Sequence, residues 1–198
     1  MDFYDMIMSP LEGSLLKKMR LEIMPQAEGD VLEVGIGTGA NGPFYRYERI
    51  RSLTGLDWKY SPELEKHYPP EKFKFVSADI EQIPFANDTF DSVVATLILC
   101  TVDIEKSLNE VMRVLKPGGN FIFIEHVRPV GLLAGKAFDA FNTVWPKLAN
   151  GCNLNRQTSK ALFQSGFADI SYQQKLGGIF LYGTATKPID ATGGDRQN

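Results

Sequence analysis

The sequence predicts an α/β fold in which a mostly parallel, seven-stranded sheet carries helices on both faces and ends in an antiparallel hairpin. Two observations lead to this prediction. Between residues 31 and 128, short apolar runs alternate with helical or turn segments, which is typical of βαβ units. Near the end of the chain, the alternating segments 168–175 and 179–186 are joined by Leu176–Gly178, a glycine-rich turn that favours a hairpin.

The first predicted strand, Val31–Val34, runs directly into three alternating glycines, Gly35, Gly37 and Gly39. Glycine lets the backbone turn sharply and touch a ligand, because no Cβ intervenes. At the carboxyl edge of a parallel sheet, such a turn forms a nucleotide-binding crevice. Glu33 lies just before the glycines, in a strand type that is buried on both faces and rarely holds an idle carboxylate. We therefore expect Glu33 to attract a cationic group and to repel a diphosphate.

The segment Gly37–Gly42 also fits the G-x-G-x-x-G pattern, which keeps an NAD-dependent oxidoreductase open as an alternative. That pattern needs a long helix directly after the glycines, so that the diphosphate sits at the helix N-terminus. Here Pro43 follows at once, and Tyr45–Arg49 is short, polar and poorly amphipathic. The dinucleotide interpretation is therefore the weaker of the two.

Acidic residues follow the next two predicted strands. The second strand, Ser52–Asp57, ends in Asp57, whose carboxylate can accept both ribose hydroxyls of a nucleotide. Trp58 comes next, and we expect it to stack beside the base rather than to pack in the core. The third strand, Phe73–Ile80, carries Asp79 near its end. Aspartate is also a common helix cap, so both acidic positions keep a purely structural alternative.

The remaining elements follow in the order that a doubly wound sheet requires. They are predicted helices at 11–24, 61–67, 103–115 and 158–166, strands at 90–96 and 120–125, and an apolar insert at 129–157. The turn Val114–Gly119 precedes the fifth strand, and Gly166 stops the last helix.

Taken in order, Glu33–Gly39, Asp57, Asp79 and the turn Val114–Gly119 resemble the motifs of the class I S-adenosylmethionine-dependent methyltransferases. The resemblance implies the Rossmann-like class I methyltransferase fold, whose C-terminal antiparallel hairpin separates it from dehydrogenases. It also implies one methyltransferase domain over residues 1–188. Within the chain we expect an N-terminal helical lid at 1–28, a substrate-side insert at 129–157 and a disordered tail at 189–198.

The same resemblance implies an enzyme that binds S-adenosylmethionine, releases S-adenosylhomocysteine and uses no metal. In the family, the acidic residue at the position of Asp79 faces the adenine amine. The residues it assigns to cofactor binding are Glu33, Gly35, Gly37, Gly39, Asp57, Trp58, Asp79, Ile80 and Leu97. A binding protein that keeps the crevice without turnover remains an alternative.

Three later segments, Leu97–Cys100, Glu125–His126 and Gly151–Arg156, resemble a narrower branch of membrane-associated proteins that methylate small thiols. That branch neighbours the ubiquinone/menaquinone and phospholipid methyltransferases. We therefore expect a small or lipophilic methyl acceptor, which is a thiol, a quinone-like phenol or an amine. The expected substrate contacts are Tyr4, Cys100 and Trp145.

His126 follows the fifth predicted strand and is the candidate catalytic base for an acceptor that must lose a proton. Its structural alternative is a hydrogen bond that fixes the end of the strand. His67 is the other histidine, and the chain has two cysteines. Because these four residues are scattered along the sequence, they predict no zinc site.

The net charge of −3 provides no basic surface for nucleic acid, and Lys17–Arg20, the densest basic segment, is expected to be a solvated helix face. No apolar run reaches the length of about 20 residues that a membrane-spanning helix needs. The acidic start Met1–Asp5 differs from the basic start of a secretory signal. We expect a cytoplasmic protein with at most peripheral membrane contact, because the anchor of the thiol-methylating branch is not seen here.

Overall fold

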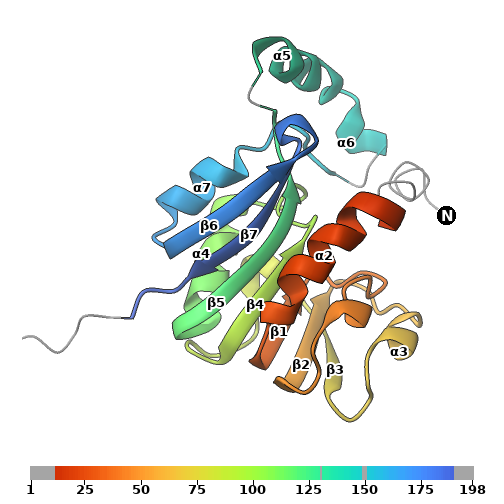
Figure 1. The fold of residues 1–198 in the computed structure, drawn as a ribbon, viewed down its shortest axis with the longest axis vertical. Helices are drawn as coiled ribbons and strands as arrows, with labels where there is room; N and C mark the ends of the chain where they lie inside the picture. Colours follow the sequence, from red (N-terminus) through yellow and green to blue (C-terminus); the bar gives the residue numbers. More distant parts are fainter. Residues whose placement is uncertain (1–11, 130, 149–150, 190–198) are drawn as a thin grey trace, which may run out of the picture.

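The computed structural model describes residues 12–129, 131–148 and 151–189 (Figure 1). These residues form one seven-stranded sheet in the order β3-β2-β1-β4-β5-β7-β6. The pairs from β3 through β5 are parallel, whereas β7 runs antiparallel to both β5 and β6. The predicted sheet and its C-terminal antiparallel hairpin are confirmed.

The elements lie close to their predicted positions. The strands are β1 (Gly29–Val34), β2 (Ile50–Asp57), β3 (Phe73–Ser77), β4 (Phe90–Thr96), β5 (Leu115–His126), β6 (Ala168–Lys175) and β7 (Phe180–Thr186). The α-helices are α2 (Lys17–Ile23), α3 (Leu64–His67), α4 (Ile104–Val114), α5 (Leu132–Phe141), α6 (Trp145–Leu148) and α7 (Thr158–Gln164). A π-helical turn, Glu12–Leu16, leads into α2.

Two strand boundaries differ from the prediction by three residues or more. The third strand ends at Ser77, because Asp79 accepts a hydrogen bond from the N–H of Glu81 (2.8 Å) and starts a short 3-10 turn. Strand β5 begins at Leu115, which pairs with Phe90. The chain then passes through Gly118, whose φ of +76° lets the backbone turn before regular pairing resumes.

The core lies on both faces of the sheet, as buried parallel strands require. Along β5, Phe121 and Phe123 pack in the same cluster as the buried residues of α4 and α7. The alternate residues Ile122 and Ile124 pack with α2 on the opposite face. Asp103 begins α4 by accepting a hydrogen bond from the N–H of Lys106 at 3.2 Å.

The insert is helical, as predicted, and forms α5 and α6. In Figure 1 both helices lie beyond the carboxyl edge of the sheet, where β5 ends and the glycine loop follows β1. The carboxyl ends of the parallel strands therefore face the helices α5 and α6. Within the described part of the chain, none of the helices combines the length and apolar character that crossing a membrane requires.

The hairpin should contribute strongly to stability, because β7 is part of the core. Leu181 in β7 is fully buried, whereas Leu176 in the hairpin turn is 55% exposed. We expect Leu181→Ala to lower the free energy of unfolding by about 2–5 kcal/mol. The matched change Leu176→Ala should alter it by less than about 0.5 kcal/mol. Urea unfolding measures both values, and equal effects would contradict the packing of the hairpin against the sheet.

Candidate active site

The glycine loop after β1 has a backbone that side chains rarely permit. Gly35, Gly37 and Gly39 have φ values of +65°, +55° and +86°. A Cβ at Gly35 would lie 2.6 Å from Cγ1 of Ile98, so this glycine lets the loops after β1 and β4 pack together. A Cβ at Gly37 would meet no atom nearer than 4.0 Å. The first glycine therefore serves packing, whereas Gly37 leaves open space in front of the backbone.

Two cavities lie at this carboxyl edge. The first, of about 250 Å³, is lined by the glycine loop together with Arg20, Glu33, Thr96 and Leu97. The second, also of about 250 Å³, is lined by Trp58, Ser77, Ala78 and Asp79. Of the predicted cofactor residues, Glu33, Gly35, Gly37 and Leu97 line the first cavity, and Trp58 and Asp79 line the second.

Asp57 joins the walls of the two cavities. Its Oδ2 accepts a hydrogen bond from the N–H of Gly37 (2.9 Å), and its Oδ1 accepts one from the N–H of Trp58 (2.7 Å). A carboxylate has further lone pairs, so both oxygens can still accept hydrogen bonds from a ligand. Trp58 is 72% exposed, which rules out the alternative that it packs in the core.

Glu33 is the centre of a buried hydrogen-bond network. Its Oε2 accepts hydrogen bonds from the hydroxyls of Tyr45 and Tyr68, and its Oε1 accepts one from Nδ2 of Asn41, each at 2.8 Å. Nε of Arg20 donates to Oδ1 of Asn41 at 2.9 Å. Burial raises the pKa of Glu33 to about 7, although the donated hydrogen bonds oppose this. One carboxylate thus ties the glycine loop to α2 and to the segment after α3.

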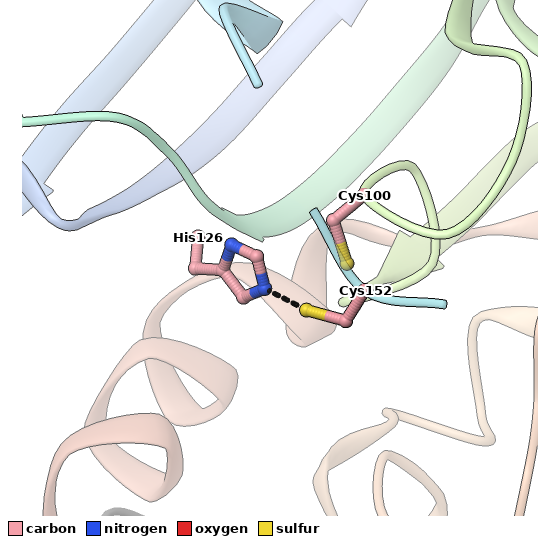
Figure 2. A group of neighbouring side chains, drawn as sticks. All are labelled: Cys100, His126 and Cys152. Carbon is pink, nitrogen blue, oxygen red and sulfur yellow. Dashed lines mark hydrogen bonds between the residues drawn. The ribbon is translucent and has the colours of Figure 1, made fainter. Parts of the chain in front are cut away.

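The opposite side of the edge holds a cluster of Cys100, His126, Trp145 and Cys152, all of them buried. Figure 2 shows the imidazole of His126 facing the sulfur of Cys152, with Cys100 beside them. Nε2 of His126 lies 2.6 Å from Sγ of Cys152, and Nε1 of Trp145 donates to the same sulfur at 3.4 Å. A hydrogen bond from Cys100, with help from His126, lowers the pKa of the Cys152 thiol.

The expectation that the cysteines and histidines are scattered is therefore wrong for three of the four residues. Cys100, His126 and Cys152 offer ligand atoms that all lie within 4.8 Å of one another. The fold explains this, because the loop after β4, the end of β5 and the segment after α6 meet at one edge of the sheet. Sequence spacing alone does not show that meeting.

Glu125 fixes the loop that carries Cys100. Its Oε1 accepts hydrogen bonds from the N–H groups of Ile98 and Leu99, each at 3.0 Å. The side chain is fully buried, and this burial raises the pKa of the Glu125 carboxyl to about 7. Leu97, at the start of the same loop, has a φ of +55° and lines the first cavity.

Comparisons with known proteins bear on this geometry. The methyltransferase domain family matches residues 32–123. Thiol S-methyltransferase TMT1B from Homo sapiens is 33% identical over 85% of this chain and 75% of its own length. The ubiquinone/menaquinone biosynthesis C-methyltransferase UbiE from Azotobacter vinelandii is 30% identical over 58% of this chain and 53% of its own. The crystal structure of a putative methyltransferase from Bacillus halodurans is 17% identical, covers 89% of this chain and 100% of its own, and has a TM-score of 0.69.

This chain belongs to the class I S-adenosylmethionine-dependent methyltransferases. The predicted family, fold and methyltransferase activity are confirmed, and the NAD-dependent alternative finds no support. In this methyltransferase the loop after the glycines is a short 3-10 turn, Gly42–Phe44, rather than the long helix of a dinucleotide site.

The other predicted site residues differ in whether they line one of the two cavities. Ile80 is buried in the core and lines neither cavity. Asp79 is half-buried and caps the turn that follows it, which is the structural role considered for it. Cys100 and Trp145 are enclosed in their cluster and line neither cavity described above. Tyr4 lies outside the described residues.

Sequence reasoning missed the partners of Glu33. Tyr45 belongs to the stretch that looked merely short and polar, Asn41 occupies a variable position of the Gly37–Gly42 pattern, and Tyr68 belongs to no motif. Arg20 corrects the expectation of a solvated basic helix face, because it is only 3% exposed, whereas Lys17 and Lys18 are exposed. The position of Arg20 on the apolar side of the predicted helix was the signal in the sequence that it is buried.

Replacing Glu33 with glutamine should remove part of the pH dependence of stability. The folded protein keeps the Glu33 proton up to about pH 7, whereas the unfolded chain releases it near 4.5, the ordinary pKa of this carboxyl. The free energy of unfolding of the wild type should therefore fall as the pH rises through this window, by up to ~3 kcal/mol from this group.

Urea unfolding at about pH 5 and about pH 7.5 measures the effect. Glu33→Gln should gain stability relative to the wild type as the pH rises. Glu48→Gln, at an exposed position, is the control and should follow the wild type at both values. A constant difference between Glu33→Gln and the wild type would show that Glu33 does not titrate in this range.

Proposed function

We propose that this methyltransferase transfers the methyl group of S-adenosylmethionine to the sulfur of a small thiol. The observation that carries the proposal is the 33% identity to thiol S-methyltransferase TMT1B over 85% of the chain. The methyltransferase family match spans residues 32–123, which is less than half of the chain. The similarity to TMT1B must therefore extend into the segments that flank the cofactor motifs.

In this proposal the cofactor occupies both cavities. The cationic amino-acid part lies beside Glu33, Gly35 and Gly37, where the open space in front of Gly37 allows close approach. The ribose lies on Asp57, between the cavities. The adenine lies in the second cavity against Trp58, with Asp79 near its amine. The three parts of the cofactor thus correspond in order to three features of the site. The amino-acid part corresponds to the first cavity, the ribose to the carboxylate of Asp57, and the adenine to the second cavity.

The reaction is a direct displacement. The acceptor thiol loses its proton, and its sulfur forms a bond to the methyl carbon while the bond from that carbon to the sulfonium breaks. The electron pair of the broken bond stays on the sulfur of S-adenosylhomocysteine. Because the positive charge disperses in the transition state, the protein mainly has to align the two sulfurs and exclude water.

The acceptor is proposed to enter between the sheet edge and the helical insert. The N-terminal segment that contains Tyr4 and the helices α5 and α6 would close over it. His126 stays a predicted catalytic base, and its Nε2 can accept a proton from the acceptor only after it leaves the contact with Cys152. We expect the enzyme to act in the cytoplasm on small molecules rather than on nucleic acid, with at most peripheral membrane contact.

A product assay tests the acceptor class. The purified chain, S-adenosylmethionine and one acceptor at a time are incubated, and S-adenosylhomocysteine is measured for a small alkyl thiol, a quinol and a primary amine. We expect product with the thiol alone. Product with the quinol and none with the thiol would point to a quinol acceptor instead. Binding of the cofactor with no product from any acceptor would support a non-catalytic binding protein.

Asp57→Ala should weaken the binding of S-adenosylmethionine at least about tenfold. A hydrogen bond to a charged group contributes about 1.5–3 kcal/mol, and the proposed ribose contact has two of them. The matched control is Glu71→Ala, which removes an exposed carboxylate outside both cavities. Isothermal titration calorimetry measures the affinities, and circular dichroism checks that the fold persists. Equal affinity of Asp57→Ala and the wild type would contradict the placement of the ribose.

A further inference from the structure

Three side chains that bind soft metals meet at the edge of the sheet. Cys100 comes from the loop after β4, His126 from the last position of β5, and Cys152 from the segment after α6. Figure 2 shows the two sulfurs and the imidazole pointing toward one another. Their ligand atoms all lie within 4.8 Å, so a single ion can reach all three after small side-chain shifts.

Backbone contacts hold the three ligands in place. The carbonyl oxygen of Cys100 accepts hydrogen bonds from both the N–H (2.9 Å) and Nδ2 (3.3 Å) of Asn153, the residue after Cys152. The N–H of Leu154 donates to Oδ1 of Asn142 at 2.7 Å, which ties the same segment to the end of α5. The two cysteine-bearing segments are therefore joined by protein contacts alone, as a preorganised site requires.

The donor set selects the kind of ion. Two thiolates and one imidazole suit zinc, whereas magnesium and calcium prefer oxygen ligands. The charges of two thiolates and one divalent zinc ion cancel, so the complex can be buried without an unpaired charge. All three residues are at least 96% buried, since none is more than 4% exposed. A monovalent ion would leave a net negative charge in the same place.

We propose that Cys100, His126 and Cys152 bind one zinc ion. Zinc–sulfur bonds of about 2.3 Å and zinc–nitrogen bonds of about 2.0–2.1 Å place tetrahedral ligand atoms less than about 4 Å apart. The contact of 2.6 Å between Nε2 of His126 and Sγ of Cys152 would lengthen to admit the ion. Three protein ligands leave the fourth position for water or another small ligand.

Two neighbouring groups fit such a site. Nε1 of Trp145 donates to Sγ of Cys152, which orients this sulfur. Nδ1 of His126 is buried and has no hydrogen-bond partner among the residues that the structure describes. When Nε2 binds the ion, Nδ1 carries the imidazole proton, which metal-bound histidines usually donate to an acceptor or to water. The proposal does not depend on which acceptor the enzyme methylates, but an ion bound at Nε2 prevents that nitrogen from acting as the catalytic base predicted for His126.

Metal titration of the full chain tests the proposal. The protein is reduced, stripped with a chelator and titrated with zinc chloride against a chromophoric zinc indicator. We expect one zinc ion per chain. Titration with cobalt(II) alone should produce thiolate-to-cobalt charge-transfer absorption, which reports sulfur ligands directly. Absence of stoichiometric zinc binding by the wild type would overturn the proposal.

Variants identify the ligands. Cys100→Ser, Cys152→Ser and His126→Gln should each lower zinc affinity at least about a hundredfold. Removing a residue that only supports a ligand already lowers metal affinity by about 10–100-fold, and removing the ligand itself should lower it further. His67→Gln is the matched control, since His67 is the only other histidine of the chain. Circular dichroism identifies any variant that fails to fold, and the cobalt spectrum of the wild type then serves as the second measurement.

A disulfide is the competing interpretation of the two cysteines. Zinc should protect both thiols of the wild type from a thiol reagent and from air oxidation, and His126→Gln should lose this protection. Equal zinc affinities of His126→Gln and His67→Gln would show that His126 is not a zinc ligand and would overturn the proposal. A disulfide that forms readily in the presence of excess zinc would overturn it as well.

Discussion

The buried carboxylate of Glu33 holds the cofactor side of this methyltransferase together. A charged group in the core is tolerated only when its hydrogen bonds are satisfied, and here three donors converge on it from Asn41, Tyr45 and Tyr68. Each donor comes from a different point along the chain after β1. The glycine loop can therefore keep its strained conformation, because its flanking segments are anchored to the strand from which it departs.

A second buried carboxyl group holds the loop after β4. Glu125, near the end of β5, is also fully buried and accepts two main-chain hydrogen bonds from the loop after β4. That loop places Leu97 at the first cavity and Cys100 in the sulfur cluster. Two buried glutamates at one edge of the sheet thus fix the loops after β1 and β4.

Local patterns in the sequence were sufficient for the fold and for much of the cofactor side. The alternating glycines, the acid at the end of β2 and the amphipathic face of α4 are short-range signals that depend on backbone geometry and burial. The partners of Glu33 and the meeting of Cys100, His126 and Cys152 depend on which distant segments share one edge. Such contacts have no periodicity, so Arg20 was assigned to a solvated face and the side chains of Cys100, His126 and Cys152 seemed unrelated.

The segment that follows the glycines explains why the dinucleotide pattern in Gly37–Gly42 is misleading. A diphosphate needs a helix N-terminus, whose free N–H groups and dipole favour negative charge. In this chain the loop continues into the three-residue turn Gly42–Phe44 and then reaches β2 without an α-helix. Glu33 lines the cavity in place of that helix, so the cavity presents a carboxyl group where a diphosphate site presents free N–H groups. The choice between a sulfonium nucleotide and a dinucleotide is therefore made by charge and by the missing helix, not by the glycines that both kinds of site share.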